Sequence, residues 1–158
     1  MKRILKYIGV FLLVILVIMQ FIRPEKNNGG LEGIVAFKTE TRPSEKVFSI
    51  LKKHCFDCHS NQTIYPWYAE VAPISYWLAD HVKHGKEDFN MSAWVTYSIK
   101  KKDHKLEELI DEIEEGEMPL NSYTWIHGNL SKKDKELLIQ WAVLARLQYK
   151  DELKVSSK

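Results

Sequence analysis

The residues with the clearest chemical potential are Cys55 and Cys58, which are three positions apart, and His59, which directly follows the second cysteine. This Cys-x-x-Cys-His spacing is the signature of covalent c-type haem attachment. Residues three apart on a helical turn lie on one face, so both thiols can add across the two vinyl groups of one haem. The same turn tethers the His59 imidazole beneath the ring as the proximal iron ligand. The motif uses both cysteines of the chain.

Three other interpretations of the two cysteines stay open at this point. A Cys-x-x-Cys pair can be a dithiol redox centre, but that motif belongs near a βαβ pattern, and no strand-rich sequence surrounds it here. The pair can also form half of a zinc site, completed by His59 and a further histidine such as His81 or His84. A short motif can also match by chance.

A second axial iron ligand is predicted at Met118. This residue follows Gly116, a helix stop, and precedes Pro119, which fixes the backbone. A thioether on such a loop can be aimed at the iron, and it raises the reduction potential relative to a second histidine. The alternative is a methionine that only fills a gap in the core. The rival ligands are His81, His84, His104, Met91 and above all His127, which lies near Met118 in sequence.

Composition indicates a single domain without affinity for nucleic acid. The chain has 158 residues, of which 45% are hydrophobic and 28% charged. Its net charge is +2, but three of its 23 basic residues, Lys2, Arg3 and Lys6, precede an apolar run. The remaining 20 basic residues are balanced by 21 acidic ones, so no basic patch for nucleic acid is expected.

The apolar run, Tyr7 to Ile22, predicts an N-terminal membrane anchor within residues 1–23. It is flanked by basic residues and lacks a small-residue cleavage site, so we expect an uncleaved transmembrane helix, with a cleaved signal peptide as the alternative. The basic amino end predicts a single-pass protein of the bacterial inner membrane with its haem domain in the periplasm. Residues 24–43, with Asn27-Asn28-Gly29-Gly30, are expected to be a flexible linker.

Residues 44–150 are predicted to form one all-α haem-binding domain, followed by a polar tail over 151–158. Ser44 is an N-cap for a helix that runs into the haem motif, and Ser131 with Asp134 predicts the start of the last helix. Gly85 and Gly116 are expected to end two helices between them. The predicted helices cover 45–59, 74–84, 106–115 and 132–149. Lys100-Lys101-Lys102 is expected to be a solvated face, with a docking patch as the alternative.

These phrases resemble a known pattern. The motif at residues 55–59, the Gly-Glu-Met-Pro sequence at 116–119 and the helix containing Trp141 look like a class I cytochrome c domain. More closely, Cys58-His59-Ser60-Asn61, Tyr65-Pro66-Trp67-Tyr68 and residues 116–120 resemble the haem-binding-domain family of small bacterial membrane-anchored cytochrome-like proteins. The resemblance implies one covalent haem c, a cytochrome c-like fold, and ligation of the iron by His59 and Met118.

The predicted function is single-electron transfer rather than enzymatic catalysis, with an unidentified redox protein as partner. Two haem axial positions filled by protein leave no site for a substrate. The first alternative is a haem sensor or peroxidase-like protein with an open distal site, where His127 or Tyr65 would supply a polar group. The second, from a binding class, is a zinc or thiol domain without haem.

Overall fold

The computed structural model describes residues 1–156 and is all-helical over that range, as the sequence predicted. Within it the only strand-like pairing is an isolated antiparallel bridge between Asn28 and Gln62. Two of the elements are short 3-10 helices, η1 and η2. The elements are α1 (Lys2–Met19), α2 (Ile34–Thr41), α3 (Glu45–His54), α4 (Phe56–His59), η1 (Trp67–Glu70), α5 (Ile74–Asp88), η2 (Met91–Thr96), α6 (Ile99–Glu115), α7 (Asn121–His127) and α8 (Lys132–Ser156).

Two predicted helix starts, at Glu45 and Lys132, are confirmed, whereas α6 begins at Ile99 after the cap Ser98 and not at Leu106 as predicted. Ser44 Oγ accepts a hydrogen bond from Val47 N at 3.2 Å, and Ser131 Oγ accepts one from Asp134 N at 3.1 Å. Gly116 ends α6 in the left-handed region, with φ 81°. Gly85 does not end α5, which continues to Asp88, because packing and not a backbone turn requires glycine there.

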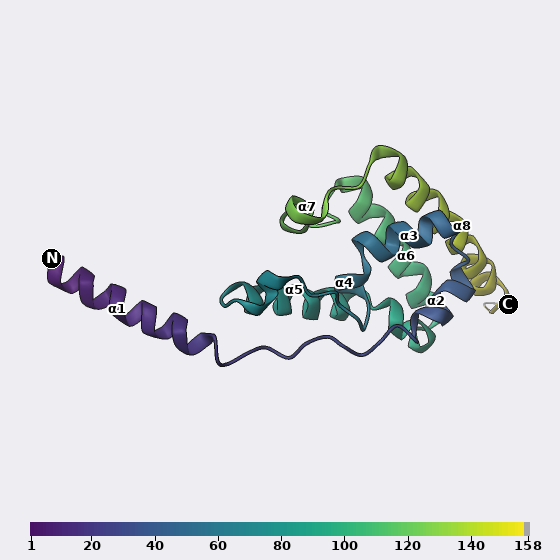
Figure 1. Ribbon diagram of the computed structural model, residues 1–158. Coiled ribbons are helices and arrows are strands. Elements are labelled where there is room, and N and C mark those ends of the chain that lie inside the picture. The colour runs from purple at the N-terminus through teal and green to yellow at the C-terminus, as the bar shows by residue number, and fades with distance from the viewer. Residues whose placement is uncertain (157–158) are drawn as a thin grey trace.

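The hydrophobic core lies between α2, α3, η2, α6 and α8 (Figure 1). Helix α6 contributes Leu106, Ile110 and Ile113, three and four residues apart, as expected for one face of a helix. Trp141 of α8 donates its indole N–H to Thr41 O at 2.8 Å, which fastens α8 to the end of α2. The fully buried Trp94 of η2 packs edge-on against the ring of Phe37. This core supports the haem motif from one side.

The predicted transmembrane helix at the N-terminus is wrong. Among residues 1–156, no helix combines the length and apolar character needed to cross a membrane. Helix α1 ends at Met19, and its first five residues include Lys2, Arg3 and Lys6. The apolar remainder, residues 7–19, spans only about 20 Å at about 1.5 Å per residue, against about 30 Å of hydrocarbon. The predicted single-pass inner-membrane location, with a periplasmic haem domain, is therefore contradicted too.

The segment after α1 runs along the loop that follows the haem motif (Figure 1). Its main contact is Asn27, whose side-chain amide donates to Ser60 O and Thr63 Oγ1, both at 2.9 Å. The backbone N–H of Asn27 donates to Tyr65 Oη at 2.7 Å. Residues predicted to be a linker thus hold the backbone directly after His59, and α2 also lies within them.

Candidate haem site

The two cysteines and His59 lie on one short helical turn. Helix α3 ends at His54, Cys55 separates it from α4, and His59 N donates to Cys55 O at 2.9 Å. Phe56, only 4% exposed, points the other way into the core and packs edge-on against Phe48, with ring centroids 5.5 Å apart. The turn is therefore anchored by Phe56, and its thiols and imidazole are left to line a cavity.

His59 is held with one ring nitrogen free. Its Nδ1 lies 2.9 Å from Phe89 O, and since a carbonyl only accepts, Nδ1 carries the hydrogen. The lone pair is then on Nε2, the atom that would bind iron. Burial lowers the pKa of His59, and the backbone hydrogen bonds to Phe89 and Gly85 and the charge of Asp88 oppose this only in part, which favours the neutral ring. A neutral imidazole with its other N–H bonded to a carbonyl is the usual state of a metal-binding histidine.

A polar network fixes the loop after His59 to the loop that carries Phe89. Asn90 Nδ2 donates to Asn61 Oδ1 at 2.9 Å, and Asn61 N donates to Ser92 Oγ at 3.0 Å. Ser60 is fully buried, and its hydroxyl donates to Gln62 O at 3.0 Å. These bonds keep the acceptor carbonyl at a fixed place relative to the His59 ring.

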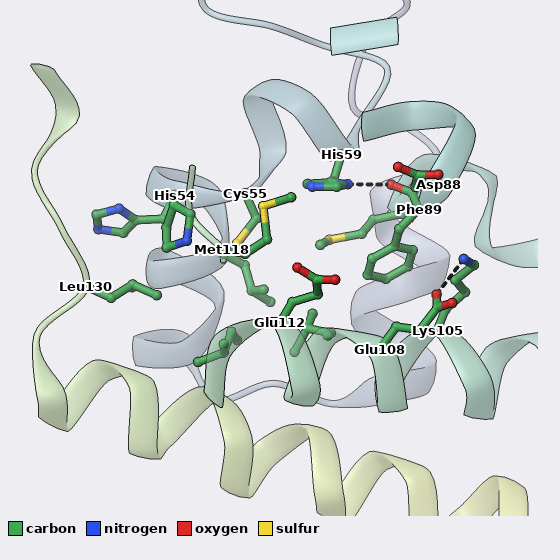
Figure 2. A pocket seen from close by; sticks show the side chains of 15 residues that line it. His54, Cys55, His59, Asp88, Phe89, Lys105, Glu108, Glu112, Met118 and Leu130 are labelled. Carbon is green, nitrogen blue, oxygen red and sulfur yellow. Dashed lines mark hydrogen bonds and ion pairs between the residues drawn. The ribbon is translucent and has the colours of Figure 1, made fainter. Parts of the chain in front are cut away.

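Met118 lies on the loop that leaves α6. Gly116 turns the chain, and Met118 N donates to Glu112 O at 3.1 Å, which holds the residue against the end of the helix. Figure 2 shows the side chains of Met118 and Cys55 close together on the side of the cavity that the His59 ring faces. The structure therefore brings together all four predicted site residues: Cys55, Cys58, His59 and Met118.

Two adjoining cavities, of about 340 and 380 Å³, meet at this point. Cys55 lines the first and Cys58 the second. The residues that line both are His54, His59, Asp88, Met118 and Pro119. The apolar lining of the first cavity is Leu51, Phe89, Met91, Leu109, Ile113 and Leu130. Its charged lining is Asp88, Lys105, Glu108 and Glu112, shown in Figure 2.

The thiols are in a state unlike that of a dithiol redox centre. Burial raises the pKa of Cys55 to about 12 and that of Cys58 to about 11, with the neighbouring Cys58 and Asp57 adding to the effect. Redox-active cysteines have a lowered pKa instead. Within residues 1–156, no three histidine, cysteine or acidic side chains are placed to hold a metal ion, so the part of the chain described here contains no zinc site on these cysteines.

The rival histidine ligands all have other partners. His127 Nε2 lies 3.1 Å from Tyr68 Oη, and its ring stacks on Tyr123 outside the two cavities that contain His59 and Met118. His104 is exposed beside Glu108 on α6. His81 Nδ1 is bonded to Trp77 O, and His84 is paired with Asp80, although both histidines line the second cavity. Met91, 1% exposed, lines the first cavity and is the remaining rival.

A small polar cluster joins α7 to Asp57, which lies between the two cysteines. Tyr123 Oη lies 3.0 Å from Asp57 Oδ2 and 2.9 Å from Lys53 O. Burial and the negative charge of Asp57 raise the pKa of Tyr123, so the phenol stays protonated and donates. Residues 121–127 form a helix that ends at Gly128 with φ 77°, and this helix is not among those predicted from the sequence.

The residues present fit a haem group. Cys55, Cys58 and His59 line the two adjoining cavities, and two thiols with one imidazole are the donor set that covalent haem requires. Within residues 1–156, His54 Nδ1 is buried without a hydrogen-bond partner, whereas Lys105 on the cavity wall is ion-paired with Glu108. A haem carboxylate would supply an acceptor for His54 Nδ1.

Several residues around the site were not found from the sequence. The Phe89 carbonyl acts through its backbone, so no side-chain pattern marks it. Asn90 and Ser92 act through hydrogen bonds to Asn61, which lies 29 and 31 positions earlier in the sequence. Tyr97 acts through a bond to the backbone N–H of Asn90. The polar pair Ser60-Asn61 after His59 was the one available signal.

Comparison with known proteins agrees with this geometry. The family model described as "Haem-binding domain" matches residues 14–143, which is most of the chain. The chain belongs to this haem-binding-domain family, and its cofactor is haem. No curated protein and no solved structure matches it.

Proposed function

We propose that this protein carries one covalently attached haem c and transfers single electrons between two redox proteins. The observation that carries the proposal is that Cys55, Cys58 and His59 share one helical turn beside two adjoining cavities, both lined by His59, whose Nδ1 is bonded to Phe89 O. Covalent attachment uses two thiols at this spacing, because each S–H adds across one of the two vinyl groups of haem. The addition consumes no oxidant.

The bound haem would supply a one-electron Fe(III)/Fe(II) couple, with the electron taken from a reduced partner and passed to an oxidised one. The residues of the chain hold and tune it. His59 and Met118 would hold the iron, and the Phe89 carbonyl fixes the tautomer of His59. The apolar side chains of the first cavity would shield part of the haem from water, which favours the less charged ferrous state and so raises the potential.

The test is a denaturing gel stained for haem, using protein made in cells that have a c-type maturation system. We expect a stained band at the mass of this chain in the wild type and none in the Cys55→Ser/Cys58→Ser variant. As a control, Ser60→Ala changes the neighbouring loop but no thiol, and it should keep the stain. A protein band that never takes haem stain would remove covalent attachment from the proposal.

Electron transfer is tested separately from attachment. The reduced holoprotein should resist carbon monoxide, since Met118 would occupy the iron, and it should exchange electrons with small redox mediators. Rapid carbon monoxide binding by the wild-type protein would replace electron transfer with the sensor or peroxidase-like alternative.

A further inference from the structure

The peptide group between Phe89 and Asn90 is held at both of its polar atoms. Its carbonyl oxygen accepts from His59 Nδ1 at 2.9 Å, and its N–H donates to Tyr97 Oη at 3.0 Å. One planar peptide unit therefore separates the proposed iron ligand from a phenol hydroxyl. We propose that Tyr97 is a positioning residue that sets the donor strength of His59 through this peptide, an inference that rests on the proposed haem ligation.

The effect follows from the polarity of the amide. Donation of the Asn90 N–H to Tyr97 moves electron density toward the Phe89 oxygen, and hydrogen bonds linked in a chain strengthen one another. A stronger acceptor draws the Nδ1 hydrogen of His59 and makes Nε2 a better electron donor. A better donor stabilises ferric iron more than ferrous iron, so Tyr97 lowers the reduction potential.

Tyr97 is built into a fixed position. Its ring packs against that of the fully buried Trp94, with centroids 5.9 Å apart. Lys101 Nζ lies over the Tyr97 ring, 4.1 Å from its centroid. These two neighbours, one from η2 and one from α6, hold the hydroxyl beside the Asn90 N–H.

The peptide itself is equally constrained. The Asn90 side chain bonds to Asn61 through Nδ2 and accepts from Ser92 N through Oδ1, at 2.9 and 3.0 Å. A peptide that cannot rotate transmits the loss of the Tyr97 bond as a change in polarity and not as a change in geometry. Loss of the hydroxyl should therefore change the potential without displacing the axial ligands.

The test compares the holoprotein with its Tyr97→Phe and Tyr65→Phe variants. Tyr65 is a matched control, because its hydroxyl also accepts a backbone N–H, that of Asn27, on a peptide that does not bond to His59. We expect Tyr97→Phe to raise the equilibrium constant for reduction about threefold. At about 59 mV per tenfold change for one electron, this raises the midpoint potential by about 30 mV. Tyr65→Phe should leave the potential unchanged.

A second measurement separates this inference from the proposed function. Proton exchange at His59 Nδ1, followed by NMR, should be faster in Tyr97→Phe and unchanged in Tyr65→Phe, whether or not haem is bound. A wild-type protein without covalent haem would refute the proposed function. The NMR comparison would still test whether Tyr97 acts on His59 through the peptide. The role of Tyr97 would be overturned by equal midpoint potentials for wild type and Tyr97→Phe with haem in place, or by equal shifts in potential in the two variants. Equal rates of Nδ1 proton exchange in wild type and Tyr97→Phe would overturn it as well.

Discussion

Tyr123 Oη donates to Asp57 Oδ2 at 3.0 Å, which joins helix α7 to the residue between the two cysteines. Helix α7 follows directly on the Met118-Pro119 loop, and Met118 N donates to Glu112 O of α6. The Tyr123 bond therefore attaches the haem motif to the segment that carries the proposed distal ligand. Asp57 also accepts from Ile64 N at 2.9 Å, so its carboxylate organises two loops.

Removal of the Tyr123 hydroxyl should weaken the attachment of α7 to the haem motif. Tyr123→Phe leaves the Asp57 oxygen and Lys53 O without that donor, which should lower the free energy of unfolding by about 1 to 2 kcal/mol. Urea unfolding measures the loss, and carbon monoxide binding by the reduced holoprotein should become faster. Tyr7→Phe on the exposed face of α1 is the control and should change neither quantity. An unchanged unfolding midpoint for Tyr123→Phe would contradict this role.

Gly85 allows α5 to pass close to the haem motif. A Cβ atom at this position would lie 2.9 Å from Cys58 O and 3.0 Å from Cys58 Cβ, so backbone would have to move. Alanine gains about 1 kcal/mol in helix propensity, but overpacking should outweigh it, and we expect a net destabilisation of about 1 to 2 kcal/mol. Thermal unfolding checks this. Gly9→Ala, in open space on α1, is the matched helical control, and equal behaviour of the two variants would show that the contact is unimportant.

Met118 should be the residue whose loss opens the iron. Met118→Ala should abolish the ligand-sensitive absorbance of the ferric protein and allow carbon monoxide to bind the reduced form. Met91→Leu is the control, since it lines the same cavity and conserves volume at a cost below about 1.5 kcal/mol. If the absorbance is lost in Met91→Leu and kept in Met118→Ala, the distal ligand has been assigned to the wrong methionine.

Glu40 should contribute an acid-dependent part of the stability. Burial alone would raise the pKa of its carboxyl, but Lys102, Tyr149 and Trp94, which bond to it, hold that pKa below its ordinary value. A lowered pKa in the folded state means that the stabilisation is complete above the unfolded pKa of about 4.5 and is lost as the pH falls through the lower folded value.

Urea unfolding at pH 7 and pH 3 tests this assignment for Glu40. The loss of stability between the two pH values should be smaller in Glu40→Gln than in the wild type. Glu45→Gln is the control, because the side chain of Glu45 is 85% exposed and pairs only with Lys38 in the described structure. An equal loss in wild type and Glu40→Gln would show that the Glu40 carboxyl does not carry the acid dependence.

Local chemistry was sufficient to predict the haem motif and much of the helical pattern. The spacing of Cys55, Cys58 and His59 is the one that the proposed covalent attachment requires, so it is visible in five consecutive residues. Caps such as Ser44 and Ser131 act within one turn, and their bonds were found where the sequence placed them. The same local information misjudged residues 1–23, because the apolar composition of the run hid the early end of α1 at Met19.

Tertiary structure alone decided how the proposed ligands are held. The sequence determined that two thiols and an imidazole share one turn, since neighbouring residues on a helix have fixed relative positions. It could not determine that Phe89 accepts from His59, that Tyr97 supports the same peptide, or that Tyr123 reaches Asp57, 66 positions away. Those contacts depend on how separate helices pack, and the packing is set by the sum of many weak burial terms that no short pattern contains.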